Sequence, residues 1–199
     1  MTPLADIDLI LASTSPYRRE LLARLTSRIR QIAPEVDESP RPGETRPVLA
    51  ARLAEAKARN VARQNPGTVV IGSDQVAELG SRTLSKPGNA DAAREQLALC
   101  SARDAVFHTA VCVIDARAAT VETRSAIVTT RVVFRRLDAD EIDRYIERDN
   151  PLACAGSFKA EALGIALFDR IESDDPTALI GLPLIALCRC LRQLDISVI

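Results

Sequence analysis

Lysine is rare in this sequence, and its three lysines lie in distinctive surroundings. Of the 26 basic residues, only Lys57, Lys86 and Lys159 are lysines, and all the others are arginines. A lysine ammonium is a compact point charge, whereas an arginine guanidinium is a bulkier planar fork. A compact charge suits a narrow site that holds phosphate oxygens beside a metal ion. The lysines are therefore candidates for a phosphate site, with chance composition as the alternative.

A second candidate is the run from Ser13 to Arg19, which follows an apolar segment. Ser15 is a good helix N-cap and Pro16 a good first helical residue. At a helix N-terminus, free N–H groups and the helix dipole favour an anion. Arg18 and Arg19 add positive charge where the dipole alone disfavours it, so the pattern favours a phosphate ligand. A plain capped helix with solvated arginines is the alternative.

Two further segments supply carboxylates. Asp74 follows an apolar strand predicted at residues 68–72, and ligands of α/β sheets gather at the carboxyl ends of strands. A carboxylate there could hold a metal ion or orient a water molecule; a turn aspartate that caps its own backbone is the alternative. Glu35, Asp37 and Glu38 lie on a proline-flanked loop. Such loops are usually just solvated, and this one gains interest because the other candidates also lie on strand-end loops.

Histidine and cysteine usage excludes several kinds of site. His108 is the single histidine, which excludes clustered histidine metal sites. It lies in a β-type run, where a structural or substrate-edge role is favoured over catalysis. The five cysteines include no Cys-x-x-Cys motif, so the sequence predicts neither a disulfide framework nor a zinc site. A metal ion must then be held mainly by carboxylates, which selects hard ions such as Mg²⁺ or Mn²⁺.

The composition is that of an ordinary soluble protein. The chain has 199 residues, is 47% hydrophobic and 27% charged, and carries a net charge of −1. This length predicts a single domain over residues 1–199, with room for two lobes. There is no basic excess for binding long nucleic acid and no apolar run of membrane-spanning length. The N-terminus lacks a basic signal-peptide region, so we expect a cytoplasmic protein with reduced thiols.

Hydrophobic periodicity predicts the elements that position these residues. Strands are predicted at 7–12, 28–33, 68–72, 105–114, 127–134 and 164–171. Helices are predicted at 16–25, 47–64, 89–100, 138–148 and 182–194, and Asn89 is the expected N-cap of the third. Strands and helices alternate through the first half, which favours an α/β sheet with right-handed crossovers. The β-rich middle of the chain predicts an antiparallel or mixed extension of that sheet.

The motifs and their order resemble those of the Maf-like nucleotide pyrophosphatases. The resemblance spans nearly the whole chain and rests on residues 9–22, 36–38, 53–58, 71–76, 86–87, 155–161 and 180–184. Gly156-Ser157-Phe158-Lys159 and Ser73-Asp74-Gln75 are similar to the subgroup that acts on 7-methyl-GTP. Members that act on dTTP and UTP carry a different arrangement at those places.

The resemblance implies an α/β fold in which a mixed, twisted central sheet is flanked by helices. This ITPase-like fold has a cleft between two lobes. The implied reaction is hydrolysis of 7-methyl-GTP to 7-methyl-GMP and pyrophosphate by metal-assisted attack of water, with Mg²⁺ or Mn²⁺ as cofactor. The implied partner is this small nucleotide, and the protein could form a homodimer. The alternatives are a pyrophosphatase for dTTP, UTP or another modified nucleotide, and a non-enzymatic inhibitor of septum formation.

The resemblance also implies roles for individual residues. Asp74 is the expected proton acceptor or water positioner, and Glu38 is the expected second carboxylate; both would hold the metal ion. Lys57 and Lys86 are the expected catalytic cations, which would meet the charge that develops on pyrophosphate. The expected substrate-binding residues, three for the phosphates and three for the base, are Ser13, Ser15 and Arg18, then Tyr17, Gln75 and Glu161.

Overall fold

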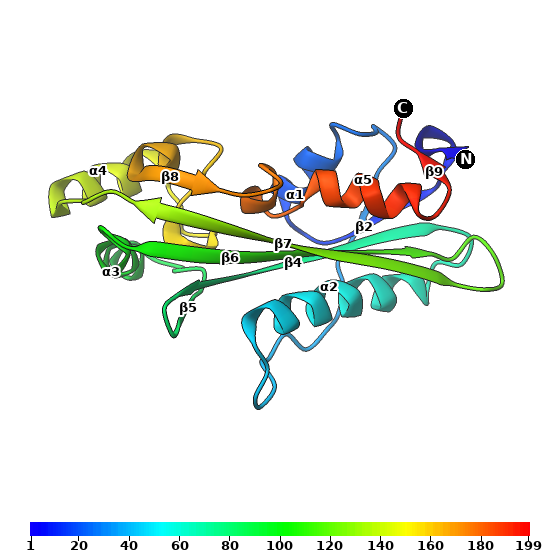
Figure 1. Ribbon diagram of the computed structural model, residues 1–199, viewed down its shortest axis with the longest axis horizontal. Coiled ribbons are helices and arrows are strands. Elements are labelled where there is room, and N and C mark those ends of the chain that lie inside the picture. The colour runs from blue at the N-terminus through cyan, green and yellow to red at the C-terminus, as the bar shows by residue number, and fades with distance from the viewer. The chain divides into compact units, whose positions relative to one another are not determined.

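A computed structural model describes residues 1–199, in which helices and strands alternate (Figure 1). The helices are α1 (Pro16–Leu22), α2 (Arg46–Ala62), α3 (Ala90–Cys100), α4 (Ala139–Asp149) and α5 (Leu184–Arg192). Short 3₁₀ turns are η1 (Leu4–Asp6), η2 (Ala155–Ser157), η3 (Leu163–Leu167) and η4 (Ala178–Ile180). The strands are β1 (Thr2–Pro3), β2 (Leu9–Ala12), β3 (Arg30–Ile32), β4 (Val69–Leu79), β5 (Arg82–Leu84), β6 (Asp104–Asp115), β7 (Glu122–Phe134), β8 (Phe168–Glu172) and β9 (Ile196–Ser197). None of the helices combines the length and the apolar character that crossing a membrane requires.

The main sheet is mixed, as the sequence predicts. Its strand order is β3-β2-β4-β6-β7-β8, and β5 pairs with β4 outside this path. Strand β2 runs parallel to both β3 and β4, whereas β5 is antiparallel to β4 and β8 is antiparallel to β7. The predicted α/β fold with a mixed central sheet flanked by helices is therefore confirmed. Strands β1 and β9 form a separate parallel pair.

The chain divides into two compact units. The first contains residues 1–75, 109–128 and 175–199, and the second contains residues 76–108 and 129–174. Strands β4, β6 and β7 contribute residues to both units. Most of the predicted site residues belong to the first unit; Lys86 and Glu161 belong to the second.

In the first unit, strand alternation sends side chains to two different helical layers. Leu9, Leu11 and Ile71 pack into a core with leucines of α1 and α5. The intervening residues point to the opposite face because successive side chains of a strand alternate. That face is covered by α2, which lies on the other side of the strands from α1 and α5 (Figure 1). Fully burying one leucine contributes about 1.5–3 kcal/mol, so these contacts fix which way each β4 residue faces.

In the second unit, the phenylalanines form one cluster. The rings of Phe107, Phe134, Phe158 and Phe168 contact one another edge to face, with centroids 4.8–5.7 Å apart. These four are all the phenylalanines of the chain. Helices α3 and α4 pack against each other in the same unit. Edge-to-face pairs stabilise beyond their buried area, so the cluster ties β6, β7, β8 and the segment after η2 into one core.

One sequence-based expectation that bears on the site is wrong: Asp74 does not lie at the end of a strand. Strand β4 continues from Val69 to Leu79, so Asp74 lies inside it. The pairing with β2 does end just before, at Gly72 opposite Ala12. Strand β4 also pairs with β6, and its last residues, Ala77–Leu79, pair with β5. Asp74 therefore lies past the carboxyl end of β2, on a strand that goes on.

Two smaller differences concern short elements. The sequence analysis did not predict β5, which follows β4 through Gly80-Ser81. Such a glycine-containing dipeptide between two strands is a hairpin signal. The strand predicted at residues 164–171 is instead the 3₁₀ turn η3 followed by β8. The helix caps are confirmed, because the Ser15 side chain accepts a hydrogen bond from Arg18 N–H and the Asn89 side chain accepts one from Ala92 N–H.

Candidate active site

A buried lysine joins two carboxylates in the first unit. Lys57 Nζ lies 2.6 Å from Asp74 Oδ1 and 2.6 Å from Glu38 Oε1. The Lys57 and Asp74 side chains are only 8% and 10% exposed, whereas that of Glu38 is 60% exposed. A charge is buried at a large desolvation cost unless it is paired, so the triad holds Lys57 in a defined position. Three of the residues predicted from the sequence are thus brought together.

Helix α2 approaches β4 unusually closely, which is what allows Lys57 to reach Asp74. Ala54 and Ala58 flank Lys57 on the buried face of α2 and are fully buried. A Cβ atom placed on Gly72 would lie 2.2 Å from Ala54 O and 2.7 Å from Ala58 N. Both are main-chain atoms, which cannot move aside without moving the helix. Gly72 therefore sets the separation between α2 and the strand that carries Asp74.

The surroundings of Asp74 act on its carboxyl group in opposite directions. Burial raises the pKa of Asp74, and the nearby charge of Glu38 acts in the same direction. Lys57 and Arg18 lower that pKa, but burial dominates and the net shift is upward. A carboxyl group whose pKa is raised above its ordinary value is a better proton acceptor than an ordinary aspartate. The site therefore holds a carboxylate suited to general base chemistry.

The loop that carries Glu38 is held by α2. We call residues 35–44 the acidic loop. Asn60 Oδ1 accepts a hydrogen bond from Glu35 N–H (3.0 Å), and Asn60 Nδ2 donates to Glu35 O (3.0 Å). Arg52 Nη2 donates to Ser39 O (2.9 Å), and Arg52 Nε lies 2.6 Å from Glu44 Oε1. The loop is thus fixed at both ends of the segment that presents Glu38, although its sequence alone suggested a solvated loop.

Asp37, another carboxylate of the acidic loop, binds a backbone group within the loop. Its Oδ1 accepts a hydrogen bond from Ser39 N–H at 2.9 Å, and this bond lowers the pKa of Asp37. The arrangement is a local turn of the kind that aspartates commonly stabilise. Asp37 therefore shapes the loop, and Glu38 is the carboxylate of the loop that joins the Lys57 triad.

Arg18 is anchored through one nitrogen and leaves the other two unused. Its Nε donates to Gly181 O at 2.8 Å, and its side chain makes no other hydrogen bond. Burial lowers the pKa of Arg18, while the nearby charges of Asp74 and Glu38 raise it. A guanidinium stays protonated in proteins, so Arg18 presents a fixed positive fork beside the two carboxylates. Such a fork matches the geometry of a phosphate group.

The two serines before α1 are engaged as acceptors. Ser13 Oγ accepts a hydrogen bond from Ser15 N–H (3.1 Å), and Ser15 Oγ accepts one from Arg18 N–H (3.3 Å). Neither hydroxyl donates to another protein group, so both retain a hydrogen for a ligand. Ser13 is buried, and Tyr17 is half-buried on the first turn of α1.

Gln75 is bound to the protein through its amide nitrogen. Gln75 Nε2 lies 3.0 Å from each of three oxygens, those of the Thr109 hydroxyl and of the Ala178 and Leu179 carbonyls. Ser73, on the same face of β4, donates from Oγ toward Gly181 O (2.9 Å) and Ala110 O (2.8 Å). Asp74 between them faces α2 instead. Strand alternation thus directs Asp74 toward Lys57 of α2, and directs Ser73 and Gln75 toward the carbonyls of residues 178–181.

The second unit holds the remaining candidates. Lys86 is exposed in the segment after β5 and makes no hydrogen bond or ion pair. Glu161 is exposed in the turn before η3. Lys159 Nζ donates to the backbone oxygen of Asp149, the last residue of α4, so this lysine stabilises a helix end. His108 lies between Glu78 Oε1 (3.1 Å) and Thr129 Oγ1 (3.2 Å), as a structural role would require.

The carboxylates of the triad offer oxygens of the kind that a hard divalent ion prefers. One oxygen of Asp74 and one of Glu38 bind Lys57, and the second oxygen of each has no protein partner. No group of three or more histidine, cysteine, aspartate or glutamate side chains is arranged so that it could hold a metal ion by itself. Mg²⁺ is commonly held by one or two carboxylates together with substrate phosphates and water. The donor set therefore fits an ion that binds together with a phosphate ligand.

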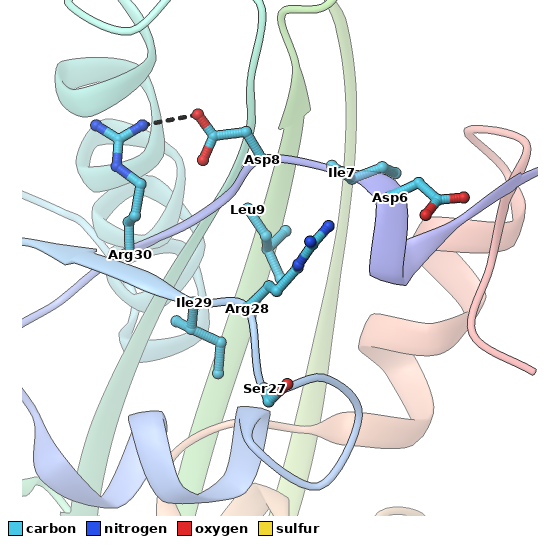
Figure 2. A pocket seen from close by; sticks show the side chains of 8 residues that line it. All are labelled: Asp6, Ile7, Asp8, Leu9, Ser27, Arg28, Ile29 and Arg30. Carbon is cyan, nitrogen blue, oxygen red and sulfur yellow. Dashed lines mark hydrogen bonds and ion pairs between the residues drawn. The ribbon is translucent and has the colours of Figure 1, made fainter.

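A separate pocket lies at the opposite end of β2 from Ser13. It has a volume of about 550 Å³ and is lined by residues 6–9 and 27–30 (Figure 2). Its charged side chains are largely paired within the protein: Arg30 Nη1 lies 2.7 Å from Asp8 Oδ2, and Arg28 Nη1 donates to Ala5 O at 2.9 Å. None of the predicted site residues lines this pocket. The pocket therefore has no part in the candidate active site.

Comparison with known proteins assigns the family. The sequence profile described as Maf-like protein matches residues 8–194. The chain belongs to the Maf-like protein family. It is 54% identical over 195 residues to the 7-methyl-GTP pyrophosphatase of Bordetella pertussis, covering 98% of this chain and 96% of that one. It is 52% identical over 194 residues to the 7-methyl-GTP pyrophosphatase of Albidiferax ferrireducens, covering 96% and 95%.

Solved structures give a more distant likeness. The Staphylococcus aureus Ham1 protein is 15% identical with a TM-score of 0.42, over 63% of this chain and 71% of that chain. A HAM1 protein from Coxiella burnetii is 16% identical with a TM-score of 0.39, over 66% and 73%. The assignment to the Maf-like family rests on the sequence relatives and not on these structures.

Several residues that shape the site were not singled out from the sequence. Asn60 and Arg52 hold the acidic loop, Gly72 sets the approach of α2, and Thr109 and Asp175 support the segment behind Arg18. Their side-chain types are common in helices, strands and turns, so composition gives no signal. Asp175 alone had a local signal, because an aspartate two residues before a threonine is typical of a side-chain turn.

Proposed function

We propose that this protein hydrolyses nucleoside triphosphates to nucleoside monophosphates and pyrophosphate, with 7-methyl-GTP as its preferred substrate. The observation that carries the proposal is the buried Lys57 bridge between Asp74 and Glu38, with the anchored Arg18 beside it. It combines fixed cations for phosphate oxygens with a carboxylate suited to accept a proton. The preference for 7-methyl-GTP is supported by relatives of that name, at 54% and 52% identity over nearly the whole chain.

In this proposal, the protein groups divide the chemical work. Asp74 accepts a proton from the attacking water, and its raised pKa suits that role. Arg18 and Lys57 stabilise the negative charge that develops as the bond between the α- and β-phosphates breaks. The hydroxyls of Ser13 and Ser15 donate to phosphate oxygens. On the resemblance alone, Lys86 is proposed as a further catalytic cation.

Asp74 and Glu38 would hold a Mg²⁺ or Mn²⁺ ion through their unpaired oxygens. When bound, such an ion neutralises phosphate charge and adds to the polarisation that the arginine and lysine provide. Water attacks directly, so no nucleophilic serine or cysteine is required. Two buried cysteines are poor nucleophiles, as direct attack by water allows. Burial raises the pKa of Cys100 and of Cys112 to about 12 and keeps both thiols protonated.

We propose that Tyr17 and Glu161 recognise the base. The 7-methylated guanine ring is positively charged, and an aromatic face attracts a flat cation. A carboxylate can accept two hydrogen bonds from the N–H groups on the pairing edge of guanine. Replacing Glu161 with Gln or Tyr17 with Ala is expected to abolish the preference for 7-methyl-GTP over GTP while hydrolysis continues.

The decisive test is pyrophosphate release from a panel containing 7-methyl-GTP, GTP, dTTP and UTP with Mg²⁺ or Mn²⁺. We expect the highest kcat/KM for 7-methyl-GTP. A higher kcat/KM for dTTP or UTP would replace the proposed substrate, and no release from any nucleotide would favour a binding protein instead. The Asp74→Asn variant serves as the control that any measured activity belongs to this site.

A further inference from the structure

The segment that binds Arg18 lies far away in the sequence and is itself held by several buried contacts. We call residues 175–181 the anchoring segment. Its last residue, Gly181, accepts hydrogen bonds from both Arg18 Nε (2.8 Å) and Ser73 Oγ (2.9 Å). Gly181 adopts a φ of +124°, a conformation that other residues rarely adopt. The carbonyl that fixes Arg18 is thus presented by a turn that requires glycine.

The middle of the anchoring segment is bound by Gln75. Carbonyl oxygens only accept hydrogen bonds, so the NH₂ group of Gln75, and not its oxygen, must face Ala178 O and Leu179 O. Thr109 Oγ1 donates to Ala178 O at 2.9 Å and accepts from Gln75 Nε2 at 3.0 Å. The donor end of Gln75 is therefore committed to the protein. Only its Oε1 has no protein partner.

The start of the anchoring segment is bound to the N-terminus of α5. Asp175 is 1% exposed, and its Oδ2 accepts from Ile185 N–H (2.7 Å) and Ala186 N–H (3.2 Å). Its Oδ1 accepts from the Thr177 hydroxyl at 2.7 Å. Thr177 Oγ1 in turn accepts from Leu184 N–H at 2.8 Å. Both ends and the middle of the segment are thus fixed before any ligand arrives.

We infer that the anchoring segment, held by Gln75, Thr109 and Asp175, preorganises Arg18 for a phosphate chain. Gln75 is then a positioning residue for Arg18 through its amide nitrogen. This inference rests on the proposed function and deepens it, because it assigns the phosphate affinity of the site to a buried network behind Arg18. With Nε committed to Gly181, the two terminal nitrogens of Arg18 face the ligand without losing further rotamer freedom.

The test uses inorganic tripolyphosphate, which has phosphates but no base and requires no turnover. Its affinity is measured by calorimetry for the parent protein, Gln75→Met, Arg18→Ala and the double variant. We expect Gln75→Met to weaken binding about tenfold in the parent and to have no further effect in the Arg18→Ala background.

Two further variants supply a control and a second test of the network. Gln193→Met changes an exposed glutamine of the same unit that makes no side-chain hydrogen bond, and it should bind like the parent. Thr109→Val removes the hydroxyl between Gln75 and Ala178 without changing side-chain shape; it should weaken binding in the same Arg18-dependent way. Thr109→Val carries the test if Gln75→Met does not fold.

Three outcomes would overturn the inference. One is the absence of tripolyphosphate binding by the parent protein or of any loss in Arg18→Ala. Another is an equal loss from Gln75→Met with and without Arg18. The third is parental tripolyphosphate affinity in both Gln75→Met and Thr109→Val, which would leave the network no part in positioning Arg18. The proposed function fails separately, if no nucleotide is hydrolysed while the Arg18-dependent binding persists.

Discussion

The acidic loop carries Glu38, and the anchoring segment binds Arg18 of α1, but the two segments are held in different ways. The acidic loop is held by three side chains of α2, those of Asn60, Lys57 and Arg52, and it presents a largely exposed Glu38. The anchoring segment is fixed through its backbone carbonyls by buried side chains and presents Gly181 O to Arg18.

The difference indicates how each charge can respond to a ligand. Glu38 is bound by one lysine on an exposed loop, so it can readjust when a metal ion or a phosphate enters. Arg18 is bound to a buried carbonyl, so its position is set in advance. The site therefore combines one adjustable carboxylate with one preset cation around Asp74. Substitutions at Asp74, in α2 and in the acidic loop test this contrast.

The largest effect is expected at Asp74, which lies close to Glu38 of the acidic loop and to Arg18, the residue that the anchoring segment binds. Asp74→Asn keeps the shape of the side chain but removes the carboxylate that Lys57 binds and that Arg18 and Glu38 face. We expect kcat to fall at least about a hundredfold, the scale of losing an acid–base group. The measurement is steady-state pyrophosphate release, with circular dichroism to establish that the variant is folded. Near-parental turnover would move the proton acceptor to another residue.

The next largest effect is expected from Gly72→Ala, which should move α2 and the acidic loop relative to β4 and leave the anchoring segment in place. Gly72→Ala places a Cβ against main-chain atoms of α2, so the helix must shift. Misplacement of catalytic groups by about 1 Å can cost up to a hundredfold, and we expect a loss of about thirtyfold in kcat. The loss of tripolyphosphate affinity caused by Arg18→Ala should stay the same in the Gly72→Ala background, because Arg18 is held from the other face.

A matched control for Gly72→Ala is Val113→Ala, which removes buried volume from the core shared with α1 and α5. It is expected to lower stability on a similar scale, by roughly 1–3 kcal/mol, without a comparable loss of kcat. If both variants lose turnover in proportion to stability, Gly72 has no special part in positioning Lys57.

A smaller loss is expected when the bridging charge is kept but its shape is changed. Lys57→Arg replaces a point charge with a bulkier fork in a site that is almost fully buried, and we expect kcat to fall about tenfold. Lys86→Arg should also impair activity, but less, because Lys86 is exposed and has room for the larger group. Parental activity in both variants would make chance composition the better account of the rare lysines.

The smallest effect concerns stability against pH and belongs to the acidic loop alone. Hydrogen bonds from Arg52 and from Arg41 N–H lower the pKa of Glu44 from 4.5 to about 2. A carboxyl group with a lowered pKa stabilises the folded state above its unfolded pKa, and this contribution is lost as pH falls from about 4.5 toward 2. In Glu44→Gln we expect a shallower loss of stability over that window, measured by urea unfolding at stepped pH. Identical pH dependence in parent and variant would contradict this role.

Local signals in the sequence were sufficient to predict much of the fold. Ser15 followed by Pro16, and Asn89 before an alanine-rich run, marked helix starts that the structure confirms, because capping depends on neighbours within three residues. The mixed sheet followed from alternating patterns in the same way. The predicted end of β4 was wrong because the strand has further partners: it pairs with β6, and its last residues pair with β5, which the sequence analysis did not predict.

Local sequence was enough to identify the chemical groups of the site and the face of the strand that each one occupies. Ser73, Asp74 and Gln75 lie on one short segment, and the two-residue period of a strand sends Asp74 to the opposite side from its neighbours. Their partners depend on tertiary packing: Lys57 binds Asp74, and the carbonyls of residues 178–181 bind Ser73 and Gln75. These partners come from segments 17 to 108 residues away, and such pairings depend on how helices and strands cross, which no local pattern encodes.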